Sequence, residues 1–218
     1  MKFLIALIFL VTCASARRMP YHCSNTNGYT SNFEATAFNT LDPNSNYPPM
    51  SFFEAGNTTT DFVGQRTFTT YVLVVEGQEP SFGSIWEFGQ TNEGYILDNG
   101  VCVKVSLDYP VPSALPLGDL IGTTKIGQFP VQIFNAALVS YNTNQTYLYD
   151  PLSCSLVSST IRNSDLTNPG FTVMNFYNFE NSFTESWFDL PSECSSQSVI
   201  SLPNFVAPKH TNILKKFF

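Results

Sequence analysis

Cysteine is the residue type whose number and spacing in this chain indicate chemistry most clearly. Of the five cysteines, Cys13 lies in an apolar amino-terminal segment, and the other four are Cys23, Cys102, Cys154 and Cys194. None of them forms a C-x-x-C pair, so the spacing does not favour a zinc site or a thioredoxin-like redox site. Four cysteines in an oxidising compartment predict two disulfides, for which three pairings exist.

Histidine, which most hydrolytic enzymes use as a base, is scarce in this chain. The two histidines are His22 and His210, one near each end. The sequence contains no G-x-S-x-G, H-E-x-x-H, P-loop or G-x-G-x-x-G motif. Carboxylates such as Glu34, Glu54 and Glu87 are available, and a pair of them would suffice for a glycosidase. No spacing among them is diagnostic, so we predict no enzymatic activity and keep a carboxylate-dependent glycosidase of the secretory pathway as the alternative.

Aspartates in polar loops are the residues that could bind a metal ion. Asp150, Asp165 and Asp189 stand among Asn and Ser residues, and calcium prefers clustered oxygen ligands. No EF-hand loop is present. The sequence therefore indicates no cofactor, and calcium stays a possible ligand whose site residues are unknown.

Two sequons mark candidate sites for N-linked glycans. They are Asn57-Thr58-Thr59 and Asn144-Gln145-Thr146, and such triplets suit the surface loops of a secreted protein. Asn57 and Asn144 are therefore the predicted glycosylation sites.

The amino-terminal segment has the pattern of a cleavable signal peptide. A charged start, Met1-Lys2, precedes an apolar run over residues 3–11, and Ala14-x-Ala16 fits the small-residue rule for cleavage. The apolar run is about half of the roughly 20 residues that a membrane-spanning helix needs. We predict that residues 1–16 are the signal peptide of a secreted protein that has no membrane span.

The composition indicates one acidic domain with a substantial core. Hydrophobic residues make up 43% of the 218 residues and charged residues only 12%, with 17 Asp and Glu against 10 Lys and Arg. An acidic chain without a basic stripe does not favour nucleic acid as a partner. We predict a single domain over residues 17–194. Residues 195–218 are predicted to be a C-terminal tail, which ends in Ile213-Leu214-Lys215-Lys216-Phe217-Phe218.

The elements that position these residues are expected to be short β-strands. Residues 67–75 are the clearest case, because aromatic and β-branched residues are concentrated there. Asn99-Gly100 between two apolar runs predicts a hairpin, and residues 113–127 contain too many Pro and Gly for a long helix. The predicted strands are residues 33–38, 52–53, 67–75, 84–88, 95–97, 101–105, 131–140, 145–149, 155–161 and 171–179. Their spacing predicts an all-β fold, either a sandwich or a half-barrel of antiparallel strands.

Aromatic residues are more numerous than one apolar face per sheet requires. Residues 171–179, for example, have apolar side chains on both faces of the predicted strand. Either the core is large, or aromatic side chains line a cavity for an apolar ligand. Trp86 and Phe88 are two residues apart and share a face of their strand, as do Val72 and Val74. The predicted cavity residues are Trp86, Phe88, Phe134, Phe176, Val72 and Val74.

Several segments, taken in order, resemble the ependymin-related family of secreted proteins. They are Phe62-Val-Gly-Gln-Arg66, Tyr95-Ile-Leu-Asp-Asn-Gly-Val-Cys102-Val-Lys104-Val-Ser-Leu107, Ile121-Gly122, Thr146-Tyr-Leu-Tyr-Asp-Pro-Leu-Ser-Cys154, and the stretch from Phe176-Tyr-Asn-Phe179 through Phe188-Asp-Leu-Pro191-Ser-Glu-Cys194. The resemblance covers about residues 21–194. It is interrupted at Gly28-Tyr29, where the family usually has tryptophan, glutamate and glycine.

The resemblance implies two stacked, curved antiparallel sheets like those of bacterial lipoprotein carriers, with a deep apolar pocket and often a homodimer. It also implies that Cys23 pairs with Cys154 and Cys102 with Cys194. The implied roles are binding of a lipid or another hydrophobic small molecule and calcium-modulated cell–matrix adhesion, in an extracellular or lysosomal location and without enzyme activity. A structural protein of the extracellular matrix, with aromatics in an interface and no cavity, is a further alternative.

Overall fold

The computed structural model describes residues 23, 26–41, 48–107, 109–137, 142–195 and 200–201. The predicted signal peptide lies outside these residues. The fold is all-β, as predicted, with two short helical pieces after the last long strand: η2 (Glu185–Phe188) and α1 (Ser192–Ser195). The strands are β1 (Gly28–Thr40), β2 (Met50–Asp61), β3 (Arg66–Val75), β4 (Ser81–Phe88), β5 (Glu93–Asp98), β6 (Val101–Ser106), β7 (Leu117–Ile126), β8 (Phe129–Ala136), β9 (Thr143–Asp150), β10 (Ser155–Asn163), β11 (Phe171–Glu180) and β12 (Ile200–Ser201).

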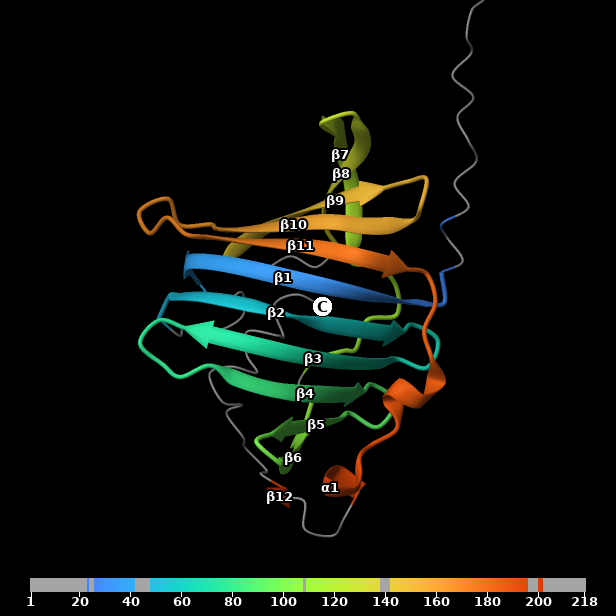
Figure 1. Cartoon of the computed structure of the whole chain (residues 1–218). Helices are drawn as coiled ribbons and strands as arrows, with labels where there is room; N and C mark the ends of the chain where they lie inside the picture. The colour runs from blue at the N-terminus through green and yellow to red at the C-terminus, as the bar shows by residue number, and fades with distance from the viewer. Residues whose placement is uncertain are drawn as a thin grey trace, which may run out of the picture.

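All twelve strands belong to one hydrogen-bonded sheet, in the order β12-β6-β5-β4-β3-β2-β1-β11-β10-β9-β8-β7 (Figure 1). Every pairing is antiparallel except that of β12 with β6. The prediction of curved antiparallel strands is confirmed, but the strands are bonded as one continuous sheet rather than as two separate sheets. The sheet does not close into a barrel, because β12 and β7 lie at its two ends.

Several strands are longer than the sequence pattern predicted. β1 extends beyond residues 33–38 at both ends, and β2 includes the polar run Asn57-Thr58-Thr59-Thr60-Asp61. Threonine is β-branched and fits a pleated strand, and β1 and β2 are neighbours in the middle of the sheet, with partners on both sides. Long polar strands are therefore stabilised by their neighbours, and a hydrophobic pattern underestimates their length.

Strand β7 was not predicted, and the burial of its residues explains why. Its residues are exposed or half-buried along the whole strand. A strand with no buried face has no alternation of apolar and polar residues to recognise.

The predicted Asn99-Gly100 hairpin is confirmed: both residues have positive φ, 49° and 79°, as the tight turn between β5 and β6 requires.

The two faces of the sheet support separate hydrophobic clusters. We call the face that holds Phe33, Leu73 and Met174 the inner face, and its cluster draws residues from β1–β5 and β9–β11. The opposite, outer face holds a second cluster with Phe68 and Trp86, to which Phe188 of η2 and Cys194 of α1 belong. The segment with η2 and α1 runs over the outer face, at the right of Figure 1.

The predicted C-terminal tail is in part a component of the domain. β12 lies within residues 195–218, and its Ile200 and Ser201 pair with Val103 and Lys104 of β6. The sequence predicted residues 195–218 to be a C-terminal tail outside the disulfide frame, and two residues of that segment are bonded to the sheet. Residues 202–218 lie outside the described part of the chain.

Candidate functional site

The two disulfides join the cysteines that the family resemblance implied. Cys23 is bonded to Cys154 and Cys102 to Cys194, with Cα–Cα distances of 5.3 and 5.2 Å. The first bond attaches the start of the described chain to the turn between β9 and β10. The second attaches α1 to β6, so it holds the end of the outer-face segment on the sheet.

The residues predicted to line one cavity lie on opposite faces of the sheet. Phe176 pairs with Phe33 and Phe134 with Tyr147, and these two predicted residues contact the inner-face cluster. Trp86 pairs with Phe68 and Val72 with Phe82, which places Trp86, Phe88, Val72 and Val74 on the outer face. The six predicted residues therefore do not share one face of the sheet. Each pair within a strand does share a face, but only the register between strands determines which face that is.

Trp86 is a packing residue of the outer face. Its ring centroid lies 4.9 Å from that of Phe68, and its indole N–H donates to the carbonyl oxygen of Trp187 at 3.1 Å. The side chain is 5% exposed. Trp86 therefore fixes the position of η2 over the sheet, and it does not face an open space.

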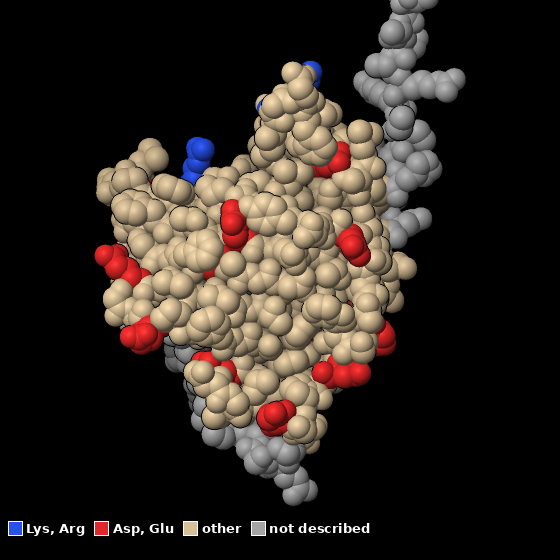
Figure 2. Space-filling model, in the orientation of Figure 1, with Lys and Arg blue, Asp and Glu red and all other residues tan. Residues whose placement is uncertain are grey.

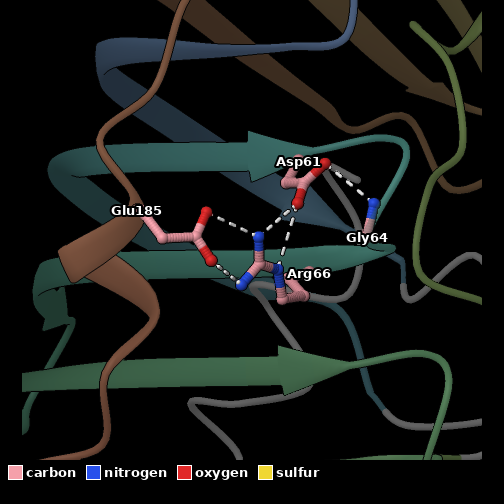
Figure 3. A network of polar contacts seen from close by, with 4 residues as sticks. All are labelled: Asp61, Gly64, Arg66 and Glu185. Carbon is pink, nitrogen blue, oxygen red and sulfur yellow. Dashed lines mark hydrogen bonds and ion pairs between the residues drawn. The ribbon is translucent and has the colours of Figure 1, made fainter.

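Arg66 is the polar link between the sheet and η2 (Figure 3). Its guanidinium donates to the buried carboxylate of Asp61, at 3.0 Å from Nε, and to both carboxylate oxygens of Glu185, at 2.6 and 2.9 Å. Asp61 also accepts the backbone N–H of Gly64 at 2.8 Å. The guanidinium stacks on the ring of Phe188, 4.4 Å from its centroid. Hydrogen bonds from Arg66 lower the pKa of Glu185 below its usual value.

Replacing Arg66 by methionine is expected to lower the free energy of unfolding by about 3 kcal/mol, because the buried Asp61 carboxylate loses its cation. Methionine keeps much of the apolar contact with Phe188. The control is Glu185→Gln, which changes an exposed carboxylate and should cost less than about 1 kcal/mol. Urea denaturation followed by circular dichroism measures both. Equal losses in the two variants would contradict a role for the Asp61 pair.

The inner face changes from apolar to hydroxyl-lined along β2 and β3. At one end, Phe52 of β2 pairs with Val75 of β3, next to Leu73 of the inner cluster. At the other end, Thr58 pairs with Thr69 and Thr60 with Thr67. All four threonines are at most 3% exposed, and the Thr58 and Thr69 hydroxyls are 3.1 Å apart. The inner face is therefore apolar at one end of β2 and β3 and lined with threonine hydroxyls at the other end.

Buried ionisable groups also lie on the inner face. Glu54 of β2 is fully buried. It pairs with Leu73 of the adjacent strand β3, which also holds Tyr71. Burial raises the pKa of Tyr71 to about 12, and the carboxylates of Asp98 and Glu54 act in the same direction. Glu54 on β2 and Asp98 on β5 are three strands apart, about 14 Å at the usual strand spacing. This spacing separates the two strand backbones, whereas a glycosidase needs its two carboxyl groups about 5–10 Å apart. A carboxylate-dependent glycosidase therefore stays the alternative prediction.

A stripe of exposed apolar side chains crosses the outer face. It comprises one residue from each of five neighbouring strands, and these side chains are between 38% and 60% exposed: Phe171 of β11, Phe38 of β1, Phe53 of β2, Val74 of β3 and Phe82 of β4. Phe38 and Phe171 are paired, with ring centroids 6.3 Å apart. Figure 2 shows this side of the molecule, with a broad uncharged area and carboxylates mostly around its margin. Exposed apolar patches of this kind mark interaction surfaces.

Two of the three aspartates that were predicted as possible calcium ligands accept hydrogen bonds within their own loops. Asp150 accepts the backbone N–H of Leu152 at 2.8 Å, and Asp165 accepts that of Thr167 at 2.8 Å. Within the described ranges, no three His, Cys, Asp or Glu side chains form a group that could hold a metal ion.

Asn144 is exposed at the start of β9 and Asn57 is half-buried in the middle of β2, so glycosylation at these positions stays a prediction.

Two features of the site were not recognised from the sequence. The threonine group resembles a loop in composition, and only its register on β2 and β3 places the hydroxyls on the inner face. Arg66 stood in a segment quoted for the family resemblance, but its partner Glu185 is 119 residues away. No local signal connects residues at that separation.

Comparison with known proteins gives two matches. Residues 22–218 match the family described as the ependymin domain of amoebozoa. An uncharacterised protein of Dictyostelium discoideum is 33% identical over 173 residues, which are 78% of this chain and 55% of that protein. The chain therefore spans about half the length of this relative. Among the residues that the structure describes, no helix has the length and apolar composition needed to cross a bilayer.

Proposed function

The chain belongs to the ependymin domain family, and we propose that it is an extracellular, non-catalytic protein that binds an amphipathic lipid on the inner face of its sheet. The family and the two disulfides suggest the extracellular location. We also propose calcium-modulated adhesion to the extracellular matrix as a role, and the lysosome as a second location. The uncharacterised relative adds nothing on ligand or partner.

The gradient along β2 and β3 is the observation that supports a lipid most directly. The apolar end, with Phe52, Leu73 and Val75, offers packing for an acyl chain. The hydroxyl end, with Thr58 and Thr69, offers hydrogen bonds to a polar head group. Partly buried apolar residues at the margin of the inner cluster, including Phe134 and Leu117, would let an apolar chain enter. Ligand sites generally combine an apolar lining with a few polar groups in this way.

The test of the proposal is to identify lipids that co-purify with the protein. Mass spectrometry of an organic extract of the native, full-length chain should detect one class of amphipathic lipid in stoichiometric amount. Palmitoyl-lysophosphatidylcholine, added to delipidated protein, should then bind saturably and raise the melting temperature. Absence of both co-purified lipid and saturable binding would reject lipid binding.

Thr69→Val is expected to weaken binding of palmitoyl-lysophosphatidylcholine about 5- to 10-fold, the value of one lost hydrogen bond. The matched control is Thr59→Val. Thr59 is also buried, and its hydroxyl lies 3.2 Å from that of Thr30, but it pairs with Phe68 on the outer face. Both variants should lose about 1 kcal/mol of stability, and only Thr69→Val should lose affinity. Isothermal titration calorimetry measures the difference, and equal affinities would place the head group elsewhere.

The exposed stripe on the outer face supports a second function, adhesion to another extracellular molecule. Five apolar side chains in a continuous row are an unfavourable surface for a protein that has no partner. Phe53→Ser and Phe82→Ser together should abolish attachment of the protein to isolated extracellular matrix while lipid binding is unchanged. Attachment at the original level would remove this candidate. Adding and chelating calcium in the same assay tests the calcium dependence.

A further inference from the structure

A row of polar, uncharged side chains crosses the outer face beside the exposed apolar stripe. The register places one such residue on each of five neighbouring strands: Tyr177 of β11, Asn32 of β1, Asn57 of β2, Thr70 of β3 and Ser84 of β4. We call these five residues the polar row. Asn32 and Tyr177 are exposed, and the other three are half-buried. The outer face therefore presents a line of hydrogen-bonding groups on successive strands, about 5 Å apart.

Hydrogen bonds between neighbouring strands hold one end of the polar row in place. Asn57 Nδ2 donates to Asn32 Oδ1 at 2.9 Å. Glu34 Oε1 accepts from Asn175 Nδ2 at 3.3 Å and from the Tyr177 hydroxyl. Among the described residues, neither Asn32 Nδ2 nor Glu34 Oε2 has a hydrogen-bond partner. A donor and an acceptor are therefore oriented on rigid strands and are free to bond a ligand.

The polar row lies inside the outer face and not at its margin. On one side, the exposed ring of Phe82 is two residues from Ser84 along β4, about 7 Å away. Phe53 of the stripe is four residues from Asn57 along β2. On the other side, Trp86 is two residues from Ser84 and is bonded to η2. A protein–protein interface has the opposite order, with an apolar centre and a polar rim.

Exposed aromatic rings beside amide and carboxylate groups are what a saccharide requires. The hydroxyls of a sugar donate to a carboxylate and accept from an amide. The C–H groups on the face of a sugar ring are attracted to the negative face of an aromatic ring. A sugar that carries acidic groups is disfavoured by Glu34 and by the acidic balance of the chain. Arg162, which pairs with Phe171, is at the other end of β11 from Tyr177.

We propose that the outer face binds a neutral saccharide chain, with sugar hydroxyls bonded to Asn32 and Glu34 and sugar rings on Phe82 and Phe53. The saccharide would lie across the strands, along the polar row. As a description of the matrix molecule, this inference rests on the second function proposed above, adhesion. Binding of a free oligosaccharide does not depend on adhesion, and the lipid site on the inner face takes no part in it.

Titration of the native, full-length chain with hexasaccharides tests the binding. The neutral probes are cellohexaose, chitohexaose and mannohexaose, and the acidic probe is a heparin hexasaccharide. Isothermal titration calorimetry should show saturable binding of at least one neutral probe and none of heparin. Failure of all three neutral probes, or binding of heparin as tight as that of the best neutral probe, would overturn the proposal.

Asn32→Ala is expected to weaken binding of the best neutral probe about 10-fold, because the hydrogen bonds of the amide to the sugar are lost. The matched control is Gln128→Ala, which removes another exposed amide, in the turn between β7 and β8, and should leave the affinity unchanged. Glu34→Gln keeps the size of the side chain and should weaken binding about 5-fold, so it decides the result if Asn32→Ala lowers the melting temperature strongly. Parental affinity in a folded Asn32→Ala or Glu34→Gln chain would exclude the polar row as the site.

The modification state of Asn57 is a second test. Asn57 stands in the polar row, so a glycan on its Nδ2 would fill the site, and this atom already donates to Asn32. We expect Asn57 to carry no glycan, contrary to the prediction from the sequon alone. Peptide mapping of the secreted, full-length protein by mass spectrometry measures the occupancy. A glycan on Asn57 in most molecules would overturn the saccharide site.

Digestion of isolated matrix with cellulase, chitinase or mannanase separates this inference from the proposed adhesion. If both hold, the enzyme that degrades the polysaccharide of the best neutral probe should abolish attachment of the protein. Attachment that survives digestion, by a protein that binds no hexasaccharide, would keep the adhesion and reject the saccharide. Hexasaccharide binding by a protein that does not attach to matrix would reject the adhesion and keep the saccharide site.

Discussion

A chain in which Cys102 and Cys194 are both replaced by alanine is expected to lose about 5 kcal/mol or more of unfolding free energy. The bond closes a loop with a sequence separation of 92 residues, which in the chain-entropy model contributes about 4–5 kcal/mol. Both cysteines are also buried in the outer-face cluster with Phe68 and Trp86. Losing the bond therefore weakens the attachment of η2 and α1 as well.

The matched control is the double replacement of Cys23 and Cys154. That bond closes a longer loop, with a separation of 131 residues, so chain entropy alone predicts a loss that is larger by about 0.3 kcal/mol. Its cysteines are only half-buried, at the edge of the inner cluster. We therefore expect the Cys102–Cys194 variant to be the less stable of the two. Guanidinium denaturation decides the order, and the opposite order would mean that loop length outweighs packing on the outer face.

Trp86→Ala is expected to lower the unfolding free energy by about 3–5 kcal/mol, the usual cost of removing a large buried aromatic side chain. The ring packs on Phe68 at 4.9 Å, and its N–H donates to the carbonyl oxygen of Trp187. Because Trp86 lies on the outer face, binding of palmitoyl-lysophosphatidylcholine to the remaining folded protein should be unchanged.

Trp187→Ala is the control for this prediction. Its side chain is partly exposed, and the substitution keeps the backbone carbonyl that accepts the hydrogen bond from Trp86. We expect a loss of about 1 kcal/mol or less. Thermal and urea denaturation, followed by far-ultraviolet circular dichroism, compare the two variants. A Trp86→Ala chain that keeps its stability but loses lipid binding would place the ligand on the outer face and contradict the assignment made here.

The sequence by itself determined the features that depend on local chemistry. An even set of cysteines after the amino-terminal segment predicted two disulfides, because pairing requires only an even number and an oxidising compartment. Asn99-Gly100 predicted a tight hairpin, because few residues adopt positive φ without strain. Alternation placed Val72 and Val74 on one face of their strand, and a set of ordered segments indicated the family.

The tertiary structure decided the features that depend on register between distant strands. It placed Trp86 and Phe176 on opposite faces, because a shift of one residue in pairing reverses the face of every side chain in a strand. It joined Arg66 to Glu185 and brought Thr58 beside Thr69 on the inner face. It revealed β7, whose exposed residues have no apolar pattern. Strand pairing across long sequence separations is specified by the whole sheet, so residue types and spacing along the chain do not contain it.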